Sequence, residues 1–396
     1  MHSSITLFSE RENCCGCGAC ANACPKKAIA IEEDQYGFVY PRINEDICIK
    51  CGICLKACFF QHNDITNEPI ATFAASAKDK KTMMRSASGG VFSVLAKKVI
   101  TEGGIAFGAA FDKNLYVQHI GIDDVHKVSQ LQGSKYVQSN IGTVYQQVKK
   151  HIERGRKVLF SGTPCQVAGL YGYLGGDREG LTTIDLVCHG VPNQRMFRDY
   201  LQSFGTVKRF SFRDKTIGWG KNGYIVYLKN GREKRKKLWE SSQPYLHYFA
   251  NGVIQRESCY SCKYACNNRP ADITLGDYWG IEKQHPEYLK NDNFSTRNGI
   301  SVVIANTEKG FKLLDACDSL LNMRKSEFSK AAAGNAQLVR PSVMPKKRQE
   351  ILDLYAKHGW QAVANRFEKN IGIRRYSSLV KSLVPQWVKI VLKQVK

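Results

Sequence analysis

The sequence predicts an α+β protein with a small cysteine-rich domain at residues 1–68, a larger α/β domain at residues 69–340 and a basic helical region at residues 341–396. Three observations support this division. Nine of the fifteen cysteines fall before residue 60. Strand-like and helix-like segments alternate beyond about residue 70, which is typical of an α/β domain. From Arg340 onward, 13 lysines and arginines face 3 aspartates and glutamates.

The two N-terminal cysteine runs share one spacing, C-x2-C-x2-C-x3-C, which is typical of bacterial ferredoxins with two cubane 4Fe-4S clusters. Two-residue spacers let three thiolates close around one cube, and the fourth cysteine of each run ligates the other cube. The predicted first set is therefore Cys14, Cys17, Cys20 and Cys58, and the predicted second set is Cys48, Cys51, Cys54 and Cys24.

Between the runs, "AIAIEEDQYGFVYPRI" predicts a β-hairpin with its turn at Tyr36-Gly37, as in a bacterial-type two-cluster ferredoxin domain. A pair of zinc sites is the alternative, but it would leave the third cysteine of each run unexplained. Cys15 does not fit the spacing and is interpreted as a bystander. Two clusters in series carry single electrons, so this domain predicts an electron path.

Two strand-turn-helix units follow in the larger domain. "RKVLFSGTPCQVAGLYGYL" predicts a buried strand from Val158 to Ser161, a tight turn and a helix, and "LTTIDLVCHGVPNQRMFRDYLQSF" repeats the pattern. Ligands bind beyond the carboxyl ends of parallel strands. Cys165 and Cys188 both fall at such ends, so the two can share a site.

Five blocks in the larger domain resemble a known family. They are "SASGGVFSVLAKKVI", "LQGSKYVQSNIG", "VLFSGTPCQVAGL", "DLVCHGVP" and "CYSCKYACNNRPADITLGDYWGI". In this order, over roughly residues 75 to 310, they look like the family of β-subunits of coenzyme F-420 hydrogenases and dehydrogenases. The resemblance implies an α/β flavin-binding domain with FAD and an additional 4Fe-4S cluster. Relatives act on a reduced deazaflavin and a plant branch reduces a hydroxymethyl chlorophyll, so the substrate stays open.

The resemblance implies ligands for the additional cluster. Carried over residue by residue, this third set is Cys165, Cys188, Cys259 and Cys262, with Cys266 in reserve. Two buried, inert cysteines are the alternative for the first two members. Cys317, in "FKLLDACDSL", is predicted to be a core residue.

The resemblance also implies flavin contacts. "SASGGVFS" stands where a loop enters a helix, so free backbone N–H groups and the helix dipole are expected to hold the pyrophosphate; a plain helix start is the alternative. "QGSKY" offers a glycine turn with a lysine, against the alternative of a solvated loop. "LGDYWG" is expected to shape the flavin or substrate pocket, although a strand-end turn explains it nearly as well. The predicted flavin residues are Ser88, Gly89, Gly90, Gln132, Gly133, Ser134, Lys135, Tyr136, Thr163 and Asp277.

The net charge of +23 usually indicates nucleic acid, an anionic membrane surface or an acidic partner. No aromatic residues interleave with a basic groove, so nucleic acid is not expected. "NGREKRKK", residues 230–237, is predicted to be a charged hairpin tip. Its basic residues are also a predicted docking site for an acidic electron carrier. "YSSLVKSLVPQWVKIVLKQVK", residues 376–396, predicts an amphipathic helix with its lysines on one arc of about 120°. Such a helix either contacts an anionic membrane surface or closes the core.

No leader-like segment and no run of eighteen apolar residues is found, which predicts a cytoplasmic protein, with peripheral contact at the inner face of the membrane as the option for its tail. The predicted function is an FAD-dependent iron-sulfur oxidoreductase that couples hydride chemistry to one-electron transfer through 4Fe-4S clusters. The alternative is a non-catalytic electron-transfer subunit of a larger complex. Expected partners are a redox partner protein or ferredoxin and a small organic redox substrate. No catalytic residue is singled out.

Overall fold

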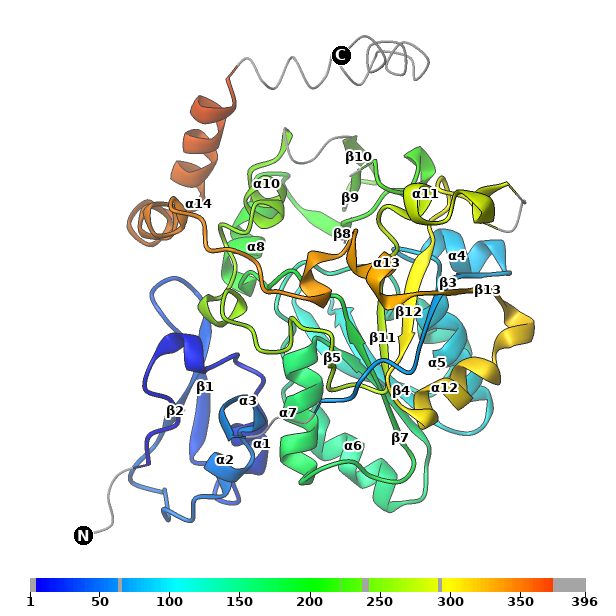
Figure 1. The fold of residues 1–396 in the computed structure, drawn as a ribbon. Helices are drawn as coiled ribbons and strands as arrows, with labels where there is room; N and C mark the ends of the chain where they lie inside the picture. Colours follow the sequence, from blue (N-terminus) through cyan, green and yellow to red (C-terminus); the bar gives the residue numbers. More distant parts are fainter. Residues whose placement is uncertain (1–4, 63–65, 222, 237–241, 291–293, 373–396) are drawn as a thin grey trace.

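The N-terminal domain of the computed structural model is small and built around one hairpin (Figure 1). The structure describes residues 5–62, 66–221, 223–236, 242–290 and 294–372. Strands β1 (Ile29–Glu33) and β2 (Val39–Ile43) pair antiparallel, beside the short helices α1 (Ala19–Ala23), α2 (Ile53–Lys56) and α3 (Phe59–His62). The Asp34 carboxylate accepts from the N–H groups of Tyr36 and Phe38, and Gly37 has φ +90°. The predicted hairpin is confirmed.

The larger domain is an eight-stranded mixed sheet in the order β13-β3-β12-β11-β7-β6-β4-β5. Its central strands β11, β7, β6 and β4 are parallel, whereas β12 and β5 run antiparallel to their neighbours. The strands are β3 (Ala71–Ala77), β4 (Ile105–Phe111), β5 (Val117–Ile122), β6 (Val158–Gly162), β7 (Leu181–Leu186), β11 (Ile273–Asp277), β12 (Ser301–Ala305) and β13 (Leu321–Ser326). The predicted α/β character is therefore found in the centre of the sheet.

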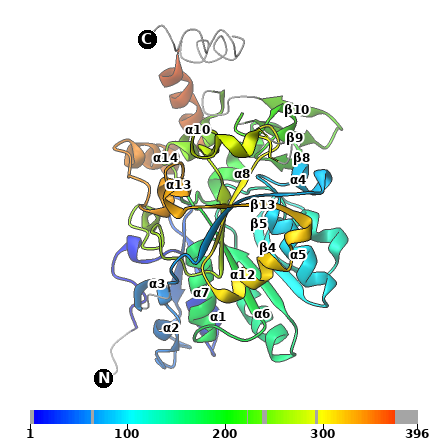
Figure 2. The ribbon, with the colours of Figure 1, turned by 45° about the vertical axis from the view of Figure 1, so that its right-hand side comes forward.

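Helices cover both faces of the large sheet (Figure 2). Because side chains alternate along a strand, Leu159 of β6 packs on one face while Val158 and Phe160 pack on the other. The helices outside the N-terminal domain are α4 (Lys80–Arg85), α5 (Val91–Thr101), α6 (Val144–Glu153), α7 (Pro164–Leu174), α8 (Gln194–Gln202), α10 (Pro244–Ala250), α11 (Ile281–Gln284), α12 (Glu308–Asp315), α13 (Phe328–Ala332) and α14 (Arg348–Ile371). Helices α5 and α12 share one core with the sheet, and α6 and α7 share the opposite one. Cys317 lies in the first of these cores, as predicted.

A second, three-stranded sheet stands beside α8 and α10. Its order is β10 (Glu233–Lys236), β9 (Tyr224–Leu228) and β8 (Val207–Ser211), all antiparallel. Gly231 turns the β9–β10 hairpin with φ +81°, so the predicted hairpin is confirmed. Aromatic rings join this sheet to the helices: Phe210 of β8 meets Phe197 of α8 edge-on, with ring centroids 5.5 Å apart.

The C-terminal region begins with α14, which is bent at Gly359, where φ is +70°. The predicted amphipathic helix at residues 376–396 lies outside the described residues, so its contact with a membrane or with the core stays a prediction. Within the described ranges, no helix combines the length and the apolar composition that crossing a membrane requires.

Two glycines let the N-terminal domain pack directly on α7, beside which it lies in both ribbon views (Figures 1 and 2). A Cβ at Gly172 would stand 2.2 Å from the Ala57 carbonyl oxygen, and one at Gly169 would stand 2.8 Å from Cys17 Sγ. The two glycines are three residues apart and therefore lie on one face of the helix. Any side chain there would force the two domains apart.

We expect Gly172→Val to loosen this contact, because an added side chain would collide with backbone at Ala57. Overpacking of this kind costs about 1–3 kcal/mol, so hydrogen exchange of the α3 and α7 amides should accelerate about tenfold. Exchange in β4 and β5 should not change. Gly108→Ala is the matched control, because a Cβ there meets Leu131 at an ordinary 3.6 Å. Unchanged exchange of α3 and α7 in Gly172→Val would show that the contact is not tight.

Candidate functional site

The structure brings the four cysteines of the predicted first set together. Gly16 and Gly18, with φ of +65° and +75°, bend the chain around them. Burial raises the pKa of Cys14, Cys20 and Cys58, and the charge of neighbouring cysteines in the set raises each of them further. Gln61 Nε2 donates to Cys58 Sγ at 3.3 Å. The four thiols therefore share one enclosed site.

The predicted second set lines a separate pocket of the N-terminal domain. Its four cysteines are all in the lining, together with Ile29, Ile43 and Ile49. The Ala28 N–H donates to Cys24 Sγ at 3.2 Å. Cys51 is exposed, so this site opens to solvent.

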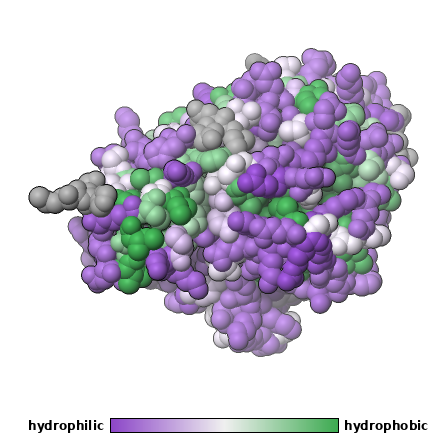
Figure 3. Space-filling view, turned by 90° about the horizontal axis from the view of Figure 1, so that it is seen from below, coloured by the Kyte–Doolittle hydropathy of each residue, from purple (hydrophilic) through white to green (hydrophobic). Residues whose placement is uncertain are grey.

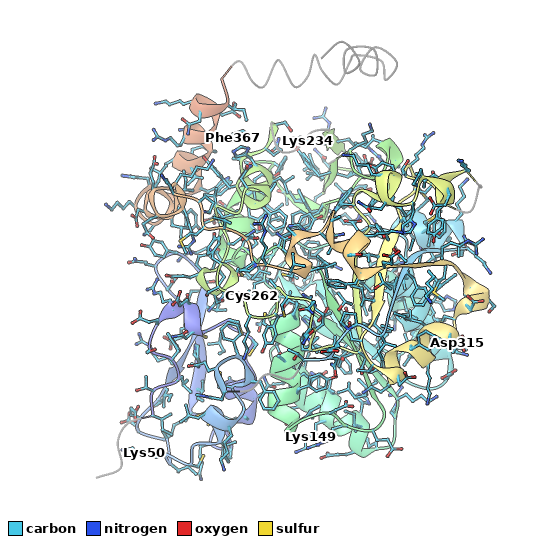
Figure 4. The ribbon with its side chains drawn as sticks, in the orientation of Figure 1. Lys50, Lys149, Lys234, Cys262, Asp315 and Phe367 are labelled. Atoms are coloured by element: carbon cyan, nitrogen blue, oxygen red, sulfur yellow. The ribbon has the colours of Figure 1, made fainter. Side chains whose placement is uncertain are left out.

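The predicted third set lines a cavity between the two domains, with Cys15 and Phe60 contributed by the small domain. Cys165 stands in the first turn of α7 and Cys188 follows β7, so both mark carboxyl ends of parallel strands. Burial raises the pKa of Cys188 to about 12 and of Cys262 to about 11, and nearby Cys165 adds to both shifts. Figure 4 places Cys262 near the boundary between the domains.

Cys266, the reserve ligand, is outside this cavity lining. Its thiol donates to the carbonyl oxygens of Lys263 and Asn268, at 3.2 and 3.0 Å. Thr163, predicted as a flavin residue, belongs instead to the third-set cavity, where its Oγ1 lies 3.2 Å from Cys165 Sγ. In the part of the chain that the structure describes, no three His, Cys, Asp or Glu side chains are arranged to hold a single metal ion.

Cys15 is not the bystander that the spacing suggested. It is 5% exposed and lines the third-set cavity, where the thiols of Cys165 and Cys17 act on it. These contacts and burial raise its pKa well above the usual value. Cys15 therefore lies between the first and third sets. The only sign of this in the sequence is that Cys15 is an additional cysteine, outside the ferredoxin spacing.

Arg256 also lies between these two sets, and sequence reasoning missed it. Its Nε donates to the Cys14 carbonyl oxygen at 2.9 Å and its Nη2 to the Val39 carbonyl oxygen at 2.6 Å. It lines the third-set cavity as well. An arginine after "NGVIQ" carries no motif, so only the fold reveals its place.

The predicted pyrophosphate loop is occupied by structural contacts. The Gly89 N–H donates to Ser301 Oγ at 2.9 Å, so it is not free for a phosphate. A Cβ at Gly89 would stand 2.3 Å from the Ala75 carbonyl oxygen. The glycine is thus needed for packing between β3 and β12, and Gly89→Val would not report on flavin. Gly90, with φ +88°, starts α5.

A polar network surrounds Asp277, at the carboxyl end of β11. Arg213 Nη2 donates to Asp277 at 2.7 Å, and Trp219 Nε1 donates to the other carboxylate oxygen at 2.7 Å. The Trp219 ring stacks on Trp279 with centroids 4.6 Å apart. Arg213 Nε also donates to the Tyr136 hydroxyl at 2.8 Å. The network therefore joins Asp277 and Tyr136, which were predicted from distant sequence blocks.

Lys215 extends this network to the loop before α5. Its Nζ donates to the carbonyl oxygens of Ser88 and Met83, at 2.7 and 2.6 Å. Burial lowers its pKa to about 8. Arg213 and Lys215 lie in "FRDKTIG", which sequence reasoning did not single out, although two cations after a short strand are a usable signal.

The remaining predicted flavin residues form one loop. Gln132 Nε2 donates to Ser93 Oγ of α5 at 2.8 Å, whereas a Cβ at Gly133 would meet open space and Ser134 is half-buried. Lys135 Nζ donates to the carbonyl oxygens of residues 130–132. Burial lowers the Lys135 pKa to about 7. The loop is thus held against α5 and is not merely solvated.

Comparisons with known proteins match two regions of the chain. Residues 155–329 match the family described as coenzyme F420 hydrogenase/dehydrogenase, C terminus of the beta subunit, and residues 13–61 match the 4Fe-4S dicluster domain. The chain is 26% identical over 178 residues to an F(420)H(2) dehydrogenase subunit of Methanosarcina mazei, which covers 42% of this chain and 50% of that protein. It thus spans about half the length of that relative.

Shorter and structural matches follow. An uncharacterized ferredoxin of Methanocaldococcus jannaschii is 31% identical over 55 residues, covering 14% of this chain and 70% of that protein. The F420-reducing [NiFe] hydrogenase complex from Methanosarcina barkeri aligns over 78% of this chain and 95% of the matched chain, with 18% identity and a TM-score of 0.45. The chain thus combines a 4Fe-4S dicluster domain at residues 13–61 with a region, residues 155–329, that matches the C terminus of coenzyme F420 hydrogenase/dehydrogenase beta subunits.

Proposed function

We propose that this protein is an iron-sulfur flavoprotein oxidoreductase that exchanges two electrons with a small organic substrate at FAD and passes single electrons through 4Fe-4S clusters. One observation carries the proposal: Cys15, next in the chain to Cys14 of the first set, lines the same cavity as the four cysteines of the third set. The first and third sets therefore lie side by side, between the ferredoxin domain and the carboxyl edge of the large sheet.

In this proposal each of the three sets holds one cubane cluster. The donors fit, because the second and third sets each place four thiols around one cavity and the first set follows the ferredoxin spacing. The buried thiols lose their protons when iron binds, and the cationic irons offset the cost of burying thiolates. The chain is then divided as expected, into a ferredoxin domain (1–68), a flavin and iron-sulfur domain (69–340) and a basic C-terminal region (341–396).

The second set supports exchange with a redox partner protein or a ferredoxin. Cys51 is exposed, and so are Ile47, Ile49 and Ile53 around it, at 47%, 56% and 42%. Figure 3, which views the molecule from below, shows hydrophobic surface on this side of the molecule. An exposed apolar rim around a cluster site gives a partner protein contact area close to the donor thiols.

The Asp277 network supports flavin at the carboxyl edge of the sheet. Arg213 and Lys215 place two cations there, and the Trp219–Trp279 pair adds a flat apolar surface. Cations and aromatic surface suit a diphosphate and a planar ring system. When bound, FAD would supply the conversion between two-electron and one-electron chemistry. The named residues would bind and orient it, and Asp277 would fix the Arg213 guanidinium.

The second candidate is an electron-transfer subunit without its own substrate chemistry. It is favoured by the Methanosarcina mazei relative, which is named as a subunit of a dehydrogenase. Flavin content separates the two candidates: a purified protein that holds all its iron but no FAD would favour the second.

We expect about twelve irons per chain after anaerobic reconstitution, because each set of four cysteines suits one four-iron cube. Cys188→Ser should remove about four irons and leave the ferredoxin-domain signal in place. Cys266→Ser is the control, since this thiol is bonded to carbonyl oxygens outside the cavity. Iron analysis with electron paramagnetic resonance measures both. Loss of iron from Cys266→Ser, or about eight irons in the unmodified protein, would reject the third set as assigned.

We also expect Arg213→Gln to weaken FAD binding by about 10- to 100-fold, because charge-assisted hydrogen bonds are worth about 1.5–3 kcal/mol. Fluorescence of retained flavin across graded FAD concentrations gives the affinity. Arg209→Gln on β8 is the matched control, because its guanidinium lies over Tyr227, away from Asp277. Equal FAD affinity in the two variants would move the flavin away from the Asp277 network.

A further inference from the structure

Arg256 is a fully buried cation with neutral partners. Its side chain donates to the carbonyl oxygens of Cys14 and Val39 and, at 3.2 Å, to Gln138 Oε1. Its guanidinium carbon lies 4.3 Å from the centre of the Tyr40 ring. The residue is 0% exposed. Among the described residues, no carboxylate comes within 4.0 Å of its guanidinium, so these contacts leave the charge without a counter-ion.

A second buried arginine in the same cavity wall is paired with a carboxylate, which is the usual arrangement for a buried charge. Arg269 is 1% exposed, and its guanidinium lies 3.0 Å from Asp185, which is 0% exposed. Charges are rarely buried unless they are paired, because removing an unpaired charge from water is very costly. Three hydrogen bonds to neutral carbonyl oxygens engage the three nitrogens of the Arg256 guanidinium but leave its full positive charge. Something else in the holoprotein must balance it.

The position of Arg256 identifies that counter-charge. The side chain bonds to the backbone of Cys14, in the first set, and lines the cavity of the third set with Cys165, Cys188, Cys259 and Cys262. A cubane cluster with four thiolates is anionic and gains a further negative charge when it accepts an electron. A cation beside it favours the reduced form, and cluster potentials depend on net charge and hydrogen bonds nearby.

We propose that Arg256 is a positioning residue whose charge is balanced by the clusters of the first and third sets and that raises the reduction potentials of both. The inference rests on the proposed function for the third set and on the 4Fe-4S dicluster domain for the first. The second set is the internal reference, because Arg256 is absent from its cavity lining.

The test is a potentiometric titration of the full-length, reconstituted protein with dithionite as electron donor, followed by electron paramagnetic resonance. Arg256→Gln should shift the midpoint potentials of the first- and third-set clusters to more negative values, while the second-set potential stays. Gln138→Glu leaves the arginine in place but supplies an isosteric carboxylate, and should shift the same two potentials in the same direction. Arg256→Lys keeps the charge and should retain most of the potential.

A matched control is Arg11→Gln, which removes an exposed arginine that already pairs with Asp34 at 2.9 Å. Its potentials should equal those of the unmodified protein. Unchanged first- and third-set potentials in Arg256→Gln and Gln138→Glu, with iron retained, would overturn the proposal. So would an equal shift in Arg256→Lys and Arg256→Gln.

Two further outcomes separate this inference from the proposed function. If Arg256→Gln does not load iron, Gln138→Glu and Arg256→Lys decide the question, since both keep a cation at residue 256. If the unmodified protein holds only about eight irons, the third cluster fails, and the first-set potential alone then supports or overturns the role of Arg256.

Discussion

The close contact between the ferredoxin domain and α7 is the constraint on which the candidate electron path depends. Gly169 and Gly172 remove side chains from one face of the helix, so that Cys17 and the Ala57 carbonyl come within contact distance of its backbone. Arg256 strengthens the same junction by bonding to two backbone carbonyls of the small domain. With the domains held this closely, Cys15 of the small domain lines the third-set cavity together with Cys165.

The topology of the large sheet explains why the residues of the candidate site lie at one edge of it. Parallel strands β6, β7 and β11 all end at the same side, where α7 begins and where the Cys188 and Asp277 segments leave the sheet. Ligand sites in parallel sheets occupy this edge because helix starts and strand ends meet there. The ferredoxin domain covers one part of the edge, and the Asp277 network occupies another. Electron path and flavin site are therefore neighbours in the proposed function.

Buried cations at this junction follow two different rules. Arg269 is paired with the Asp185 carboxylate, so its charge is balanced as soon as the chain folds. Arg256 has hydrogen bonds, but among the described residues no carboxylate is paired with it. Its charge is therefore balanced only by a group that binds beside it. Cofactor loading therefore affects the stability of the fold through Arg256. It does not affect the stability through Arg269, whose charge is already paired.

Local features were open to prediction because their signals lie within a few residues. The cysteine spacing predicts the two ferredoxin sets, the Tyr36-Gly37 turn predicts the hairpin, and the turn before Cys165 predicts the start of α7. Gly89 shows the limit of such reasoning. A glycine before a helix suggested a phosphate loop, but its neighbour is the Ala75 carbonyl of a strand that the motif does not contain.

The sequence by itself determined the dicluster domain, the strand-turn-helix units and the family resemblance, because spacing and local pattern encode them. Only the tertiary structure decided which thiols meet, that Cys15 lies between two sets, and that Arg256, Arg213 and Lys215 surround the candidate site. The physical reason is that these contacts join residues far apart in the chain, from Cys14 to Arg256 and from Ser88 to Lys215. Such contacts depend on the order of the strands in the sheet and on how closely the N-terminal domain packs against α7. No local sequence pattern carries that information.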